Sequence, residues 1–198
     1  NMAISTIFAY MGNKSSMVDS LIQAEPHSYR VYVEVFGGTM AYLLNKQPAQ
    51  VEIYNDFNKH LTNLHEIIRT RKTEFVEEVK KLYISEITYQ KFYTETWVEG
   101  NEMESAIRYF YVMCLCHLGK FTGGFSVVPQ KSYVEKFENK IEIIEAIHKR
   151  IKNIIITNKS FEKIITANNK EDTLIYCDPP YDSSETYYSK LAGSFNES

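Results

Sequence analysis

The chain has 198 residues, of which 44% are hydrophobic and 24% are charged, and its formal net charge is −3. This composition is typical of a globular domain with a real core, and it excludes a disordered or collagen-like chain. The negative balance argues against nonspecific binding of nucleic acid, although a local basic groove remains compatible with it.

The three cysteines are odd in number, which argues against a disulfide framework and for a reducing compartment. Cys114 and Cys116 stand beside His117, but no second ligand pair at zinc spacing accompanies them, so we expect no metal site. We recognise no signal peptide and no apolar run of about 18 residues. We therefore expect a cytoplasmic protein that does not interact with membranes.

The first part of the chain alternates between helical and strand patterns. Asn13 can cap the first helix, and Gly37-Gly38 turns the chain from the first strand into the second helix. We expect the elements in this order: a helix over 14–24, a strand over 31–36, a helix over 39–46 and a strand over 51–54.

Helical periodicity dominates the middle of the chain, and the strand pattern returns after it. The glycine-rich stretch 119–129 is typical of a loop or a short hairpin. We expect helices over 57–70, 73–82, 102–118 and 134–150, and strands over 153–157 and 173–177. This order predicts an α/β fold that is doubly wound around an open, mostly parallel sheet. Residues 1–60 and 151–198 would form the main domain, with 61–150 as a mostly helical insert.

Residues 174–181 read Leu-Ile-Tyr-Cys-Asp-Pro-Pro-Tyr and place Asp178 at the carboxyl end of an expected strand, where open α/β sheets bind ligands. Pro179 and Pro180 fix two φ angles near about −65° and hold the loop in one shape. Tyr181 adds a flat aromatic face. The group suits a planar heteroaromatic ring whose exocyclic amine donates to Asp178 and to the Pro179 carbonyl. The alternative is a proline-rich turn with a surface tyrosine.

The first two strands also end in residues that suit a ligand. Residues 34–38, Glu-Val-Phe-Gly-Gly, allow close approach of the backbone, but they are not the complete dinucleotide-binding fingerprint. Asp56 follows the second strand, where an acidic residue commonly holds ribose hydroxyls. Asn55-Asp56 equally suits the cap of the following helix. Near the N-terminus, Lys14 follows a glycine turn and can meet a carboxylate, or it is simply a solvated lysine.

Four blocks, in this order, carry a resemblance to a known family. The chain resembles the Dam-type (D12) class of DNA adenine-N6 methyltransferases, found in bacteria and their phages. The blocks are Tyr10-Met-Gly-Asn-Lys14, Glu34-Val-Phe-Gly-Gly38, Asn55-Asp56-Phe-Asn58 and Asp178-Pro-Pro-Tyr181. They are similar to the family's N-terminal cofactor motif, its glycine motif, its ribose motif and its catalytic motif.

The resemblance implies a Rossmann-like methyltransferase fold, S-adenosylmethionine as methyl donor, no metal, and double-stranded DNA as substrate. A flipped-out adenine would stack on Tyr181 and present its N6 amine to Asp178 and to the Pro179 carbonyl, with Pro180 holding the loop. The implied cofactor-binding residues are Tyr10, Gly12, Lys14, Glu34, Phe36, Gly37, Gly38, Asp56 and Asp178.

The sequence departs from the family at several points. Met40 stands where the family usually has a second glycine, and this could crowd the methionine end of the cofactor. The region expected to recognise the target, 114–126, offers His117, Lys120 and Thr122 instead of an Asn/Arg-rich pattern, so a GATC target does not carry over. The family continues with further strands and helices, so we expect a domain incomplete at its C-terminus, with a bare apolar edge on the last strand.

Other functions stay open on the sequence alone. The chain can be an inactive remnant that binds cofactor or DNA without catalysis. It can also be a methyltransferase for another amine, on cytosine N4, RNA or a protein glutamine, although the latter two relatives tend to carry Asn where this chain has Asp178. A plain dinucleotide-binding protein would leave the Asp-Pro-Pro-Tyr block unexplained.

Overall fold

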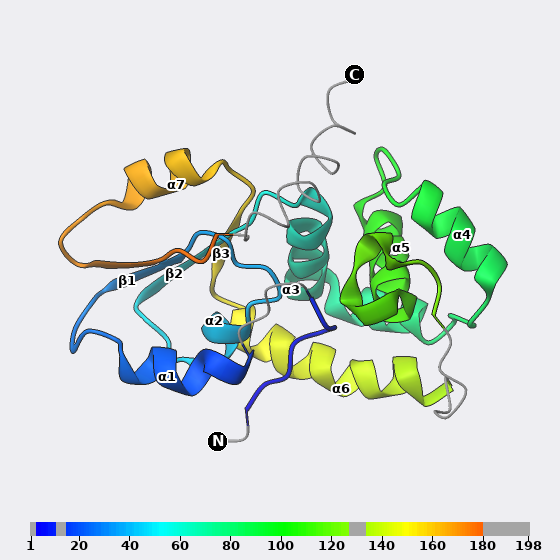
Figure 1. Ribbon diagram of the computed structural model, residues 1–198, viewed down its shortest axis with the longest axis horizontal. Helices are drawn as coiled ribbons and strands as arrows, with labels where there is room; N and C mark the ends of the chain where they lie inside the picture. The colour runs from blue at the N-terminus through cyan, green and yellow to red at the C-terminus, as the bar shows by residue number, and fades with distance from the viewer. Residues whose placement is uncertain (1–2, 11–14, 127–133, 180–198) are drawn as a thin grey trace.

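The computed structural model describes residues 3–10, 15–126 and 134–179 (Figure 1). A parallel sheet lies at one side of the molecule, and a block of helices lies beyond the ends of its strands. The strands are β1 (Val31–Glu34), β2 (Val51–Asn55), β3 (Ile155–Thr157) and β4 (Thr173–Tyr176). The helices are α1 (Val18–Gln23), α2 (Ala41–Asn45), α3 (Lys59–Val79), α4 (Glu86–Thr94), α5 (Glu102–Leu115), α6 (Val134–Ile151) and α7 (Phe161–Asn168).

The sheet has the order β3-β2-β1-β4, and each neighbouring pair runs parallel. The chain therefore builds outward from β1 to β2 and β3 and then returns to the other side of β1. This confirms the expected Rossmann-like α/β class. In the described part of the sheet β4 pairs with β1 alone and is an edge strand.

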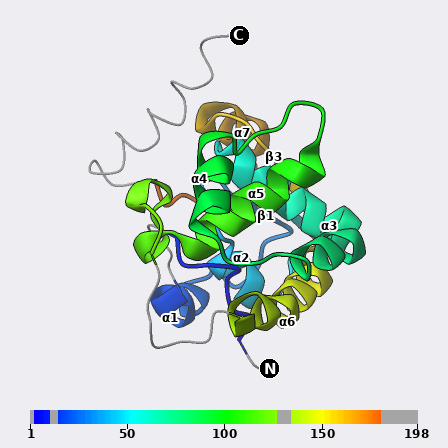
Figure 2. The ribbon, with the colours of Figure 1, turned by 90° about the vertical axis from the view of Figure 1, so that its right-hand side faces the viewer.

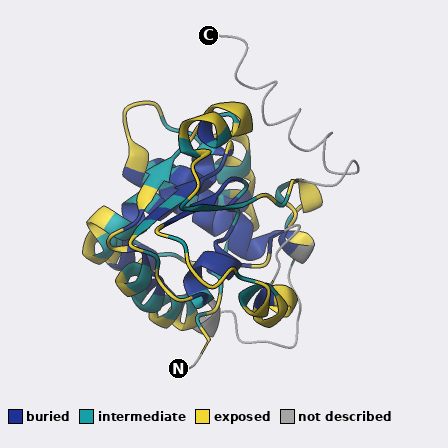
Figure 3. Ribbon diagram, turned by 90° about the vertical axis from the view of Figure 1, so that its left-hand side faces the viewer, coloured by how far each residue is buried: buried dark blue, intermediate teal, exposed yellow. Residues whose placement is uncertain are grey.

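The central strand explains how the sheet is covered. All four residues of β1 are buried, and their side chains alternate between the two faces. Tyr32 joins the core beneath α2 and α6, whereas Val31 and Val33 pack with Ile164 of α7 on the opposite face. Figure 1 shows α7 on one side of the sheet and α1, α2 and α6 on the other, and Figure 3 shows the buried layers between them.

The helical block between β2 and β3 consists of α3 to α6, with α4 and α5 facing the viewer in Figure 2. Three of its helices begin with a side chain that accepts from the first backbone N–H groups, as caps do: Asn58, Ser85 and Asn101. The hydrophobic core runs without interruption from the sheet into this block, because Leu43 of α2 and Phe110 of α5 belong to one cluster.

Several expected elements differ in the structure. The two helices expected over 57–70 and 73–82 are present, and they meet at a kink at Arg71 (φ −131°, ψ 34°) within the range of α3. Neither α4 nor α7 was expected. Both are short and rich in β-branched or aromatic residues, which lowers their helix propensity, so packing decides their state. The first strand ends at Glu34 rather than at 36, since Val35 and Phe36 already belong to the turn.

The remaining elements agree with expectation within a few residues. The glycine-rich stretch forms two 3-10 turns, His117–Gly119 and Phe121–Gly123, closed by an antiparallel bridge between Cys116 and Phe125. The first helix begins as a 3-10 turn, Ser15–Met17, and continues as α1. Its expected cap, Asn13, lies outside the described residues.

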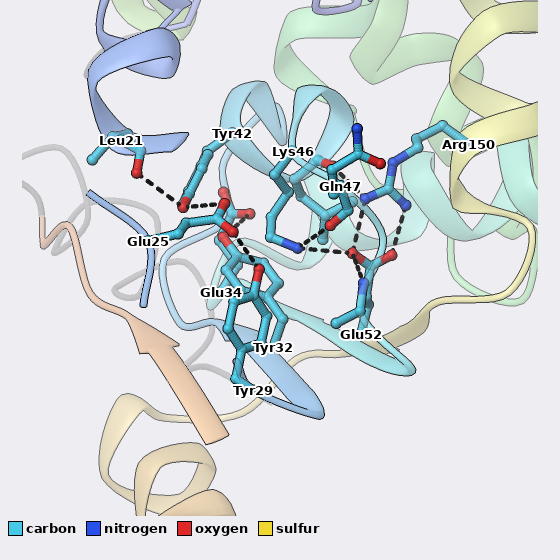
Figure 4. Close-up of polar contacts among 12 residues, drawn as sticks. Leu21, Glu25, Tyr29, Tyr32, Glu34, Tyr42, Lys46, Gln47, Glu52 and Arg150 are labelled. Carbon is cyan, nitrogen blue, oxygen red and sulfur yellow. Dashed lines mark hydrogen bonds and ion pairs between the residues drawn. The ribbon is translucent and has the colours of Figure 1, made fainter. Parts of the chain in front are cut away.

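A buried ionic cluster fixes the end of the helical block against the sheet (Figure 4). Arg150 of α6 donates through Nη1 and Nη2 to the two carboxylate oxygens of Glu52 on β2, at 2.6 and 2.8 Å. Its Nη2 also donates to the carbonyl oxygen of Leu43 in α2, at 2.6 Å. Bidentate hydrogen bonds between an arginine and a carboxylate are strong and directional. These bonds therefore fix the C-terminal end of α6, from which the chain continues to β3.

Candidate active site

The strand order predicts a ligand-binding crevice outside the carboxyl ends of β1 and β4. The chain winds in one direction from β1 to β3 and then reverses to β4, and open α/β sheets bind ligands outside the carboxyl ends of the strands at such a switch point. Glu34 pairs with Tyr54 on one side and with Tyr176 on the other. Two residues further on, Asp56 and Asp178 follow their strands on either side of β1, about 10 Å apart by the spacing of parallel strands.

The turn after β1 is held tightly against β2. The N–H of Gly37 donates to the carbonyl of Asn55 at 2.8 Å, and the Met40 N–H donates to the Gly37 carbonyl at 2.8 Å. A Cβ atom at Gly37 would overlap the ring of Tyr54. Gly38 has a φ of +51°, in the left-handed region that favours glycine. The structure therefore requires glycine at both positions of the expected turn, at Gly37 for space and at Gly38 for its backbone conformation.

Asp56 connects this turn to the start of α3. Its Oδ2 accepts from the N–H of Gly38 at 2.9 Å, and its Oδ1 accepts from the N–H of Asn58 at 2.8 Å. Burial raises the pKa of Asp56 to about 6, while the two N–H donors favour its charged form and limit the rise. Each carboxylate oxygen has a further lone pair that could accept from a hydroxyl group, although Asp56 is 3% exposed and so as buried as Glu34.

The carbonyl of Gly38 is fixed from the other side. It accepts from the hydroxyl of Tyr54 at 2.8 Å and lies 3.1 Å from Nε2 of His65. Because a carbonyl only accepts, Nε2 carries the proton, and burial lowers the pKa of His65 to about 4, so its ring is neutral. No motif marked this histidine beyond its place on an expected helix.

The two asparagines of the Asn-Asp-Phe-Asn block hold the backbone around Asp56. Asn55 donates to the carbonyls of Val35 and Lys159 at 3.0 and 2.9 Å. Asn58 caps α3 and donates to the hydroxyls of Tyr10 and Tyr109, both at 3.3 Å. The cap of the following helix, which the sequence suggested for Asn55-Asp56, is therefore made by Asn58. A cap at Asn58 is compatible with a ribose-binding role for Asp56.

Phe57 stands between Asp56 and Asn58 and was not among the expected site residues. Its side chain is 53% exposed, although it is a large apolar ring. An aromatic ring left in solvent beside a buried carboxylate offers a flat surface to a ligand. Only its position inside the ribose block could have marked it in the sequence.

Glu34 lies inside the protein rather than on the crevice (Figure 4). It is 3% exposed, and its Oε2 accepts from the hydroxyl of Tyr32 at 2.9 Å. Burial raises the pKa of Glu34 to about 8, although bonds from Tyr32 and from the backbone of Leu43 oppose the rise. Its expected part in cofactor binding stays a prediction, and the geometry favours an indirect one.

The aromatic residues expected around the cofactor lie on either side of the glycine turn. The ring of Tyr10 lies 3.5 Å from where a Cβ of Gly38 would be. Phe36 packs on Phe161 of α7, with ring centroids 5.9 Å apart. Gly12 and Lys14 lie outside the described residues. Met40, at the place of the family's second glycine, has a φ of +63°, and its side chain is completely buried in the core.

The catalytic block is described only in part. Asp178 is partly buried and Pro179 is exposed, directly after Cys177 at the end of β4. Pro180 and Tyr181 lie outside the described residues. Asp178 therefore stands at the crevice that the strand order defines, and the stacking expected for Tyr181 stays a prediction.

The three side chains expected to recognise DNA share one loop. His117, Lys120 and Thr122 are all exposed on the two 3-10 turns after α5. This loop packs against the N-terminal segment, because a Cβ atom at Gly119 would overlap the carbonyl oxygen of Ala9. The expected recognition loop and the segment that leads into the expected cofactor motif are thus neighbours in space.

Two further properties concern the described residues only. Within 3–10, 15–126 and 134–179, no three His, Cys, Asp or Glu residues cluster in a way that could hold a metal ion. Among the helices of the described ranges, none is both long and apolar enough to cross a bilayer. Cys114 and Cys116 are both buried, and Sγ of Cys116 donates to the carbonyl of Met113 at 3.5 Å.

The fold defines the chain as a Rossmann-like α/β protein whose parallel sheet has its switch point between β1 and β4. The family model described as D12 class N6 adenine-specific DNA methyltransferase matches residues 10–198. The chain belongs to this family, as its four sequence blocks predict.

Several curated proteins are similar to this chain. A type II methyltransferase, M.CviBI, of Paramecium bursaria Chlorella virus NC1A is 25% identical over 92% of this chain and 71% of its own length. A DNA adenine methylase of Vibrio cholerae is 25% identical over 87% of this chain and 63% of its own. The retron Ec67 DNA adenine methylase of Escherichia coli is 26% identical over 93% of this chain and 66% of its own length. The chain thus spans about two thirds of the length of these relatives.

Proposed function

We propose that this chain is the cofactor-binding and catalytic part of a DNA methyltransferase that transfers a methyl group from S-adenosylmethionine to N6 of adenine in double-stranded DNA. Family membership supports the reaction class. The observation that supports the proposal is the strand order, in which β1 and β4 are parallel neighbours, so that the Gly37-Gly38 turn and Asp178 follow adjacent strand ends.

The residues at this crevice support the proposed cofactor. Gly38 is partly exposed at the turn, each carboxylate oxygen of Asp56 has a further lone pair, and the exposed ring of Phe57 offers a surface for an adenine base. Tyr10 and Phe36 would flank the turn, with Gly12 and Lys14 at the methionine part. Glu34 would act indirectly by holding the turn. S-adenosylmethionine supplies an electrophilic methyl group when bound.

Asp178 and Pro179 would act on the target base. The N6 amine of adenine is a poor nucleophile because its lone pair is delocalised into the ring. Hydrogen bonds from its two N–H groups to Asp178 and to the Pro179 carbonyl would draw that pair out of conjugation and orient it. Tyr181 would stack on the flipped base, and Pro180 would keep the loop in shape. Such orientation and preorganised acceptors together supply on the order of 10 kcal/mol in enzymes.

The exposed loop with His117, Lys120 and Thr122 is the proposed contact with the target sequence. Its side chains offer donors and acceptors suited to base edges and phosphates. A DNA-modifying enzyme of this kind would act in the cytoplasm of a bacterial or phage-infected cell.

The first test measures cofactor binding by calorimetry and transfer of labelled methyl to unmethylated DNA, followed by nucleoside analysis. Label in N6-methyladenine supports the proposal, and label in N4-methylcytosine overturns the base assignment. Absence of cofactor binding overturns it altogether. Binding of cofactor or DNA without transfer by this chain supports instead the second candidate, a chain that binds without catalysis.

A variant pair tests the role of Asp178. We expect Asp178→Ala to lower turnover by about 10²–10³-fold, a loss typical of removing a polar group that acts in the transition state, with little change in cofactor affinity. Asp172→Ala is the matched control, because Asp172 lies just before the same strand and pairs with Arg30 at the exposed surface. Equal losses of turnover and cofactor affinity in Asp178→Ala would contradict the assigned role.

A further inference from the structure

The N-terminal segment 7–10 is held by residues of the helical block. Ile7, Phe8 and Tyr10 are buried. The ring of Phe8 meets the ring of Tyr109 on α5 edge to face, with centroids 6.0 Å apart. Ala9 lies against Gly119, as described above. The segment that leads into the proposed cofactor motif therefore depends on the block for its position.

A single side chain joins this segment to the block. Asn58 donates from Nδ2 to the hydroxyl of Tyr10 and to the hydroxyl of Tyr109, each at 3.3 Å. Its Oδ1 accepts from the N–H of His60 at 3.0 Å and from the N–H of Leu61 at 3.4 Å. The two backbone donors fix which end of the amide carries oxygen, so both hydrogens of Nδ2 face the two tyrosines.

Asn58 also contacts Asp56, the residue proposed to bind the ribose hydroxyls. The backbone N–H of Asn58 donates to Oδ1 of Asp56 at 2.8 Å. A continuous path of hydrogen bonds thus runs from Tyr109, through Asn58, to both Tyr10 and Asp56. The ring of Tyr109 is fixed on its other sides, because it stacks on His60 and packs against Phe121.

We propose that the hydroxyl of Tyr109 is a positioning group for the cofactor site, acting through Asn58 on Tyr10 and Asp56. The inference rests on the proposed function, since it takes Tyr10 and Asp56 as cofactor residues. Tyr109 lies far in sequence from all four family blocks, and its hydroxyl is joined to the site through Asn58. Without its hydroxyl, one N–H of the Asn58 amide loses an acceptor in a buried place, and the amide is no longer held in one orientation.

The variant Tyr109→Phe removes this hydroxyl and keeps the ring. We expect the dissociation constant for S-adenosylmethionine to rise about fivefold to tenfold, the effect of one hydrogen bond in a buried network. Calorimetry on this chain measures it directly, without a need for turnover. The emission of Trp97, the single tryptophan, reports whether packing is retained, because its ring contacts His60, which stacks on Tyr109.

Tyr111→Phe is the matched control. Tyr111 lies on the same helix and is equally buried, but its hydroxyl bonds to the carbonyl of Tyr83 and to the backbone of Ser85, inside the block. We expect this variant to lower the melting temperature and to leave cofactor affinity unchanged. A merely structural role for Tyr109 would make the two variants alike.

The outcomes separate the two proposals. A weaker cofactor affinity in Tyr109→Phe alone, with Trp97 emission unchanged, supports the positioning role. Unchanged affinity in Tyr109→Phe, or equal weakening in both variants, overturns it while the proposed function stands. If the wild-type chain does not bind S-adenosylmethionine, the proposed function fails and the inference fails with it.

Discussion

Asp56 accepts a hydrogen bond from the backbone N–H of Gly38, 2.9 Å away, across the carboxyl ends of two neighbouring strands. The same carboxylate accepts from the N–H of Asn58 at 2.8 Å. One side chain thus fixes both the turn after β1 and the entry into α3. The residue proposed to hold ribose hydroxyls is also the residue that shapes the backbone around the site.

Asp56→Ala leaves two backbone N–H groups in a buried place without an acceptor. We expect a loss of about 2–4 kcal/mol in the free energy of unfolding, because each unsatisfied donor costs about 1–3 kcal/mol. Asp56→Asn keeps one acceptor oxygen and should lose about half as much. Urea denaturation measures both variants. An Asp56→Ala protein as stable as wild type would show that this carboxylate does not hold the turn.

Gly37 permits the contact between the turn and β2. A methyl group there would overlap the ring of Tyr54, which is completely buried and cannot move aside freely. Gly37→Ala should therefore cost about 3 kcal/mol of stability and weaken cofactor binding. Gly100→Ala is the control, since Gly100 has a φ of +71° but nothing near its missing Cβ, so backbone strain alone should cost about 1 kcal/mol. Equal costs at both positions would contradict the overlap.

Met40 is the single residue other than glycine with a positive φ among the residues that the structure describes. Met40→Ala and Met40→Gly both remove the same buried contacts, but glycine adopts a φ of +63° without strain. We expect Met40→Gly to be more stable than Met40→Ala by about 1 kcal/mol, the reverse of the usual order near a helix. Thermal unfolding compares the stabilities of the two variants. If Met40→Ala were more stable than Met40→Gly, the assigned backbone conformation of Met40 would be refuted.

Glu34 makes stability fall as the pH rises. Its pKa is raised from 4.5 to about 8 by burial, so the folded protein binds a proton that the unfolded chain releases. The stabilisation is complete below about pH 4.5 and is lost as the pH rises through 8. Glu34→Gln should remove a decline on the order of a few kcal/mol across this window. Chemical denaturation at several pH values compares the slopes, and parallel profiles would contradict the burial of a protonated carboxyl.

His65 acts in the opposite direction. Burial lowers its pKa from 6.5 to about 4, so the unfolded chain binds a proton that the folded protein excludes. Its contribution is present above about pH 6.5 and is lost as the pH falls through 4. His65→Gln should reduce the loss of stability on the acid side of the profile by about 1–3 kcal/mol. Burial also lowers the pKa of His60 to about 4, so part of the acid limb should remain, and a profile identical to that of the wild type would contradict the prediction for His65.

Short helices mark the limit of sequence patterns in this chain. The strands, the glycine turn and α6 carry strong local signals, and the structure confirms them within a few residues. The helices α4 and α7 have weak local preferences, so tertiary packing selects their state. The cap at Ser85, which accepts from the N–H of Thr88, was the available signal for α4.

The sequence by itself determined the family, the α/β class and the order of the four blocks. Each block is a short run of neighbouring residues, and the α/β class follows from local helix and strand patterns. Only the tertiary structure decided which side of β1 carries β4, that Glu34 faces the core, and that Asn58 joins Tyr10 to Tyr109. These relations join residues tens of positions apart, and they depend on packing and desolvation. Local propensity and residue spacing contain no information about how distant residues pack or how strongly they are desolvated.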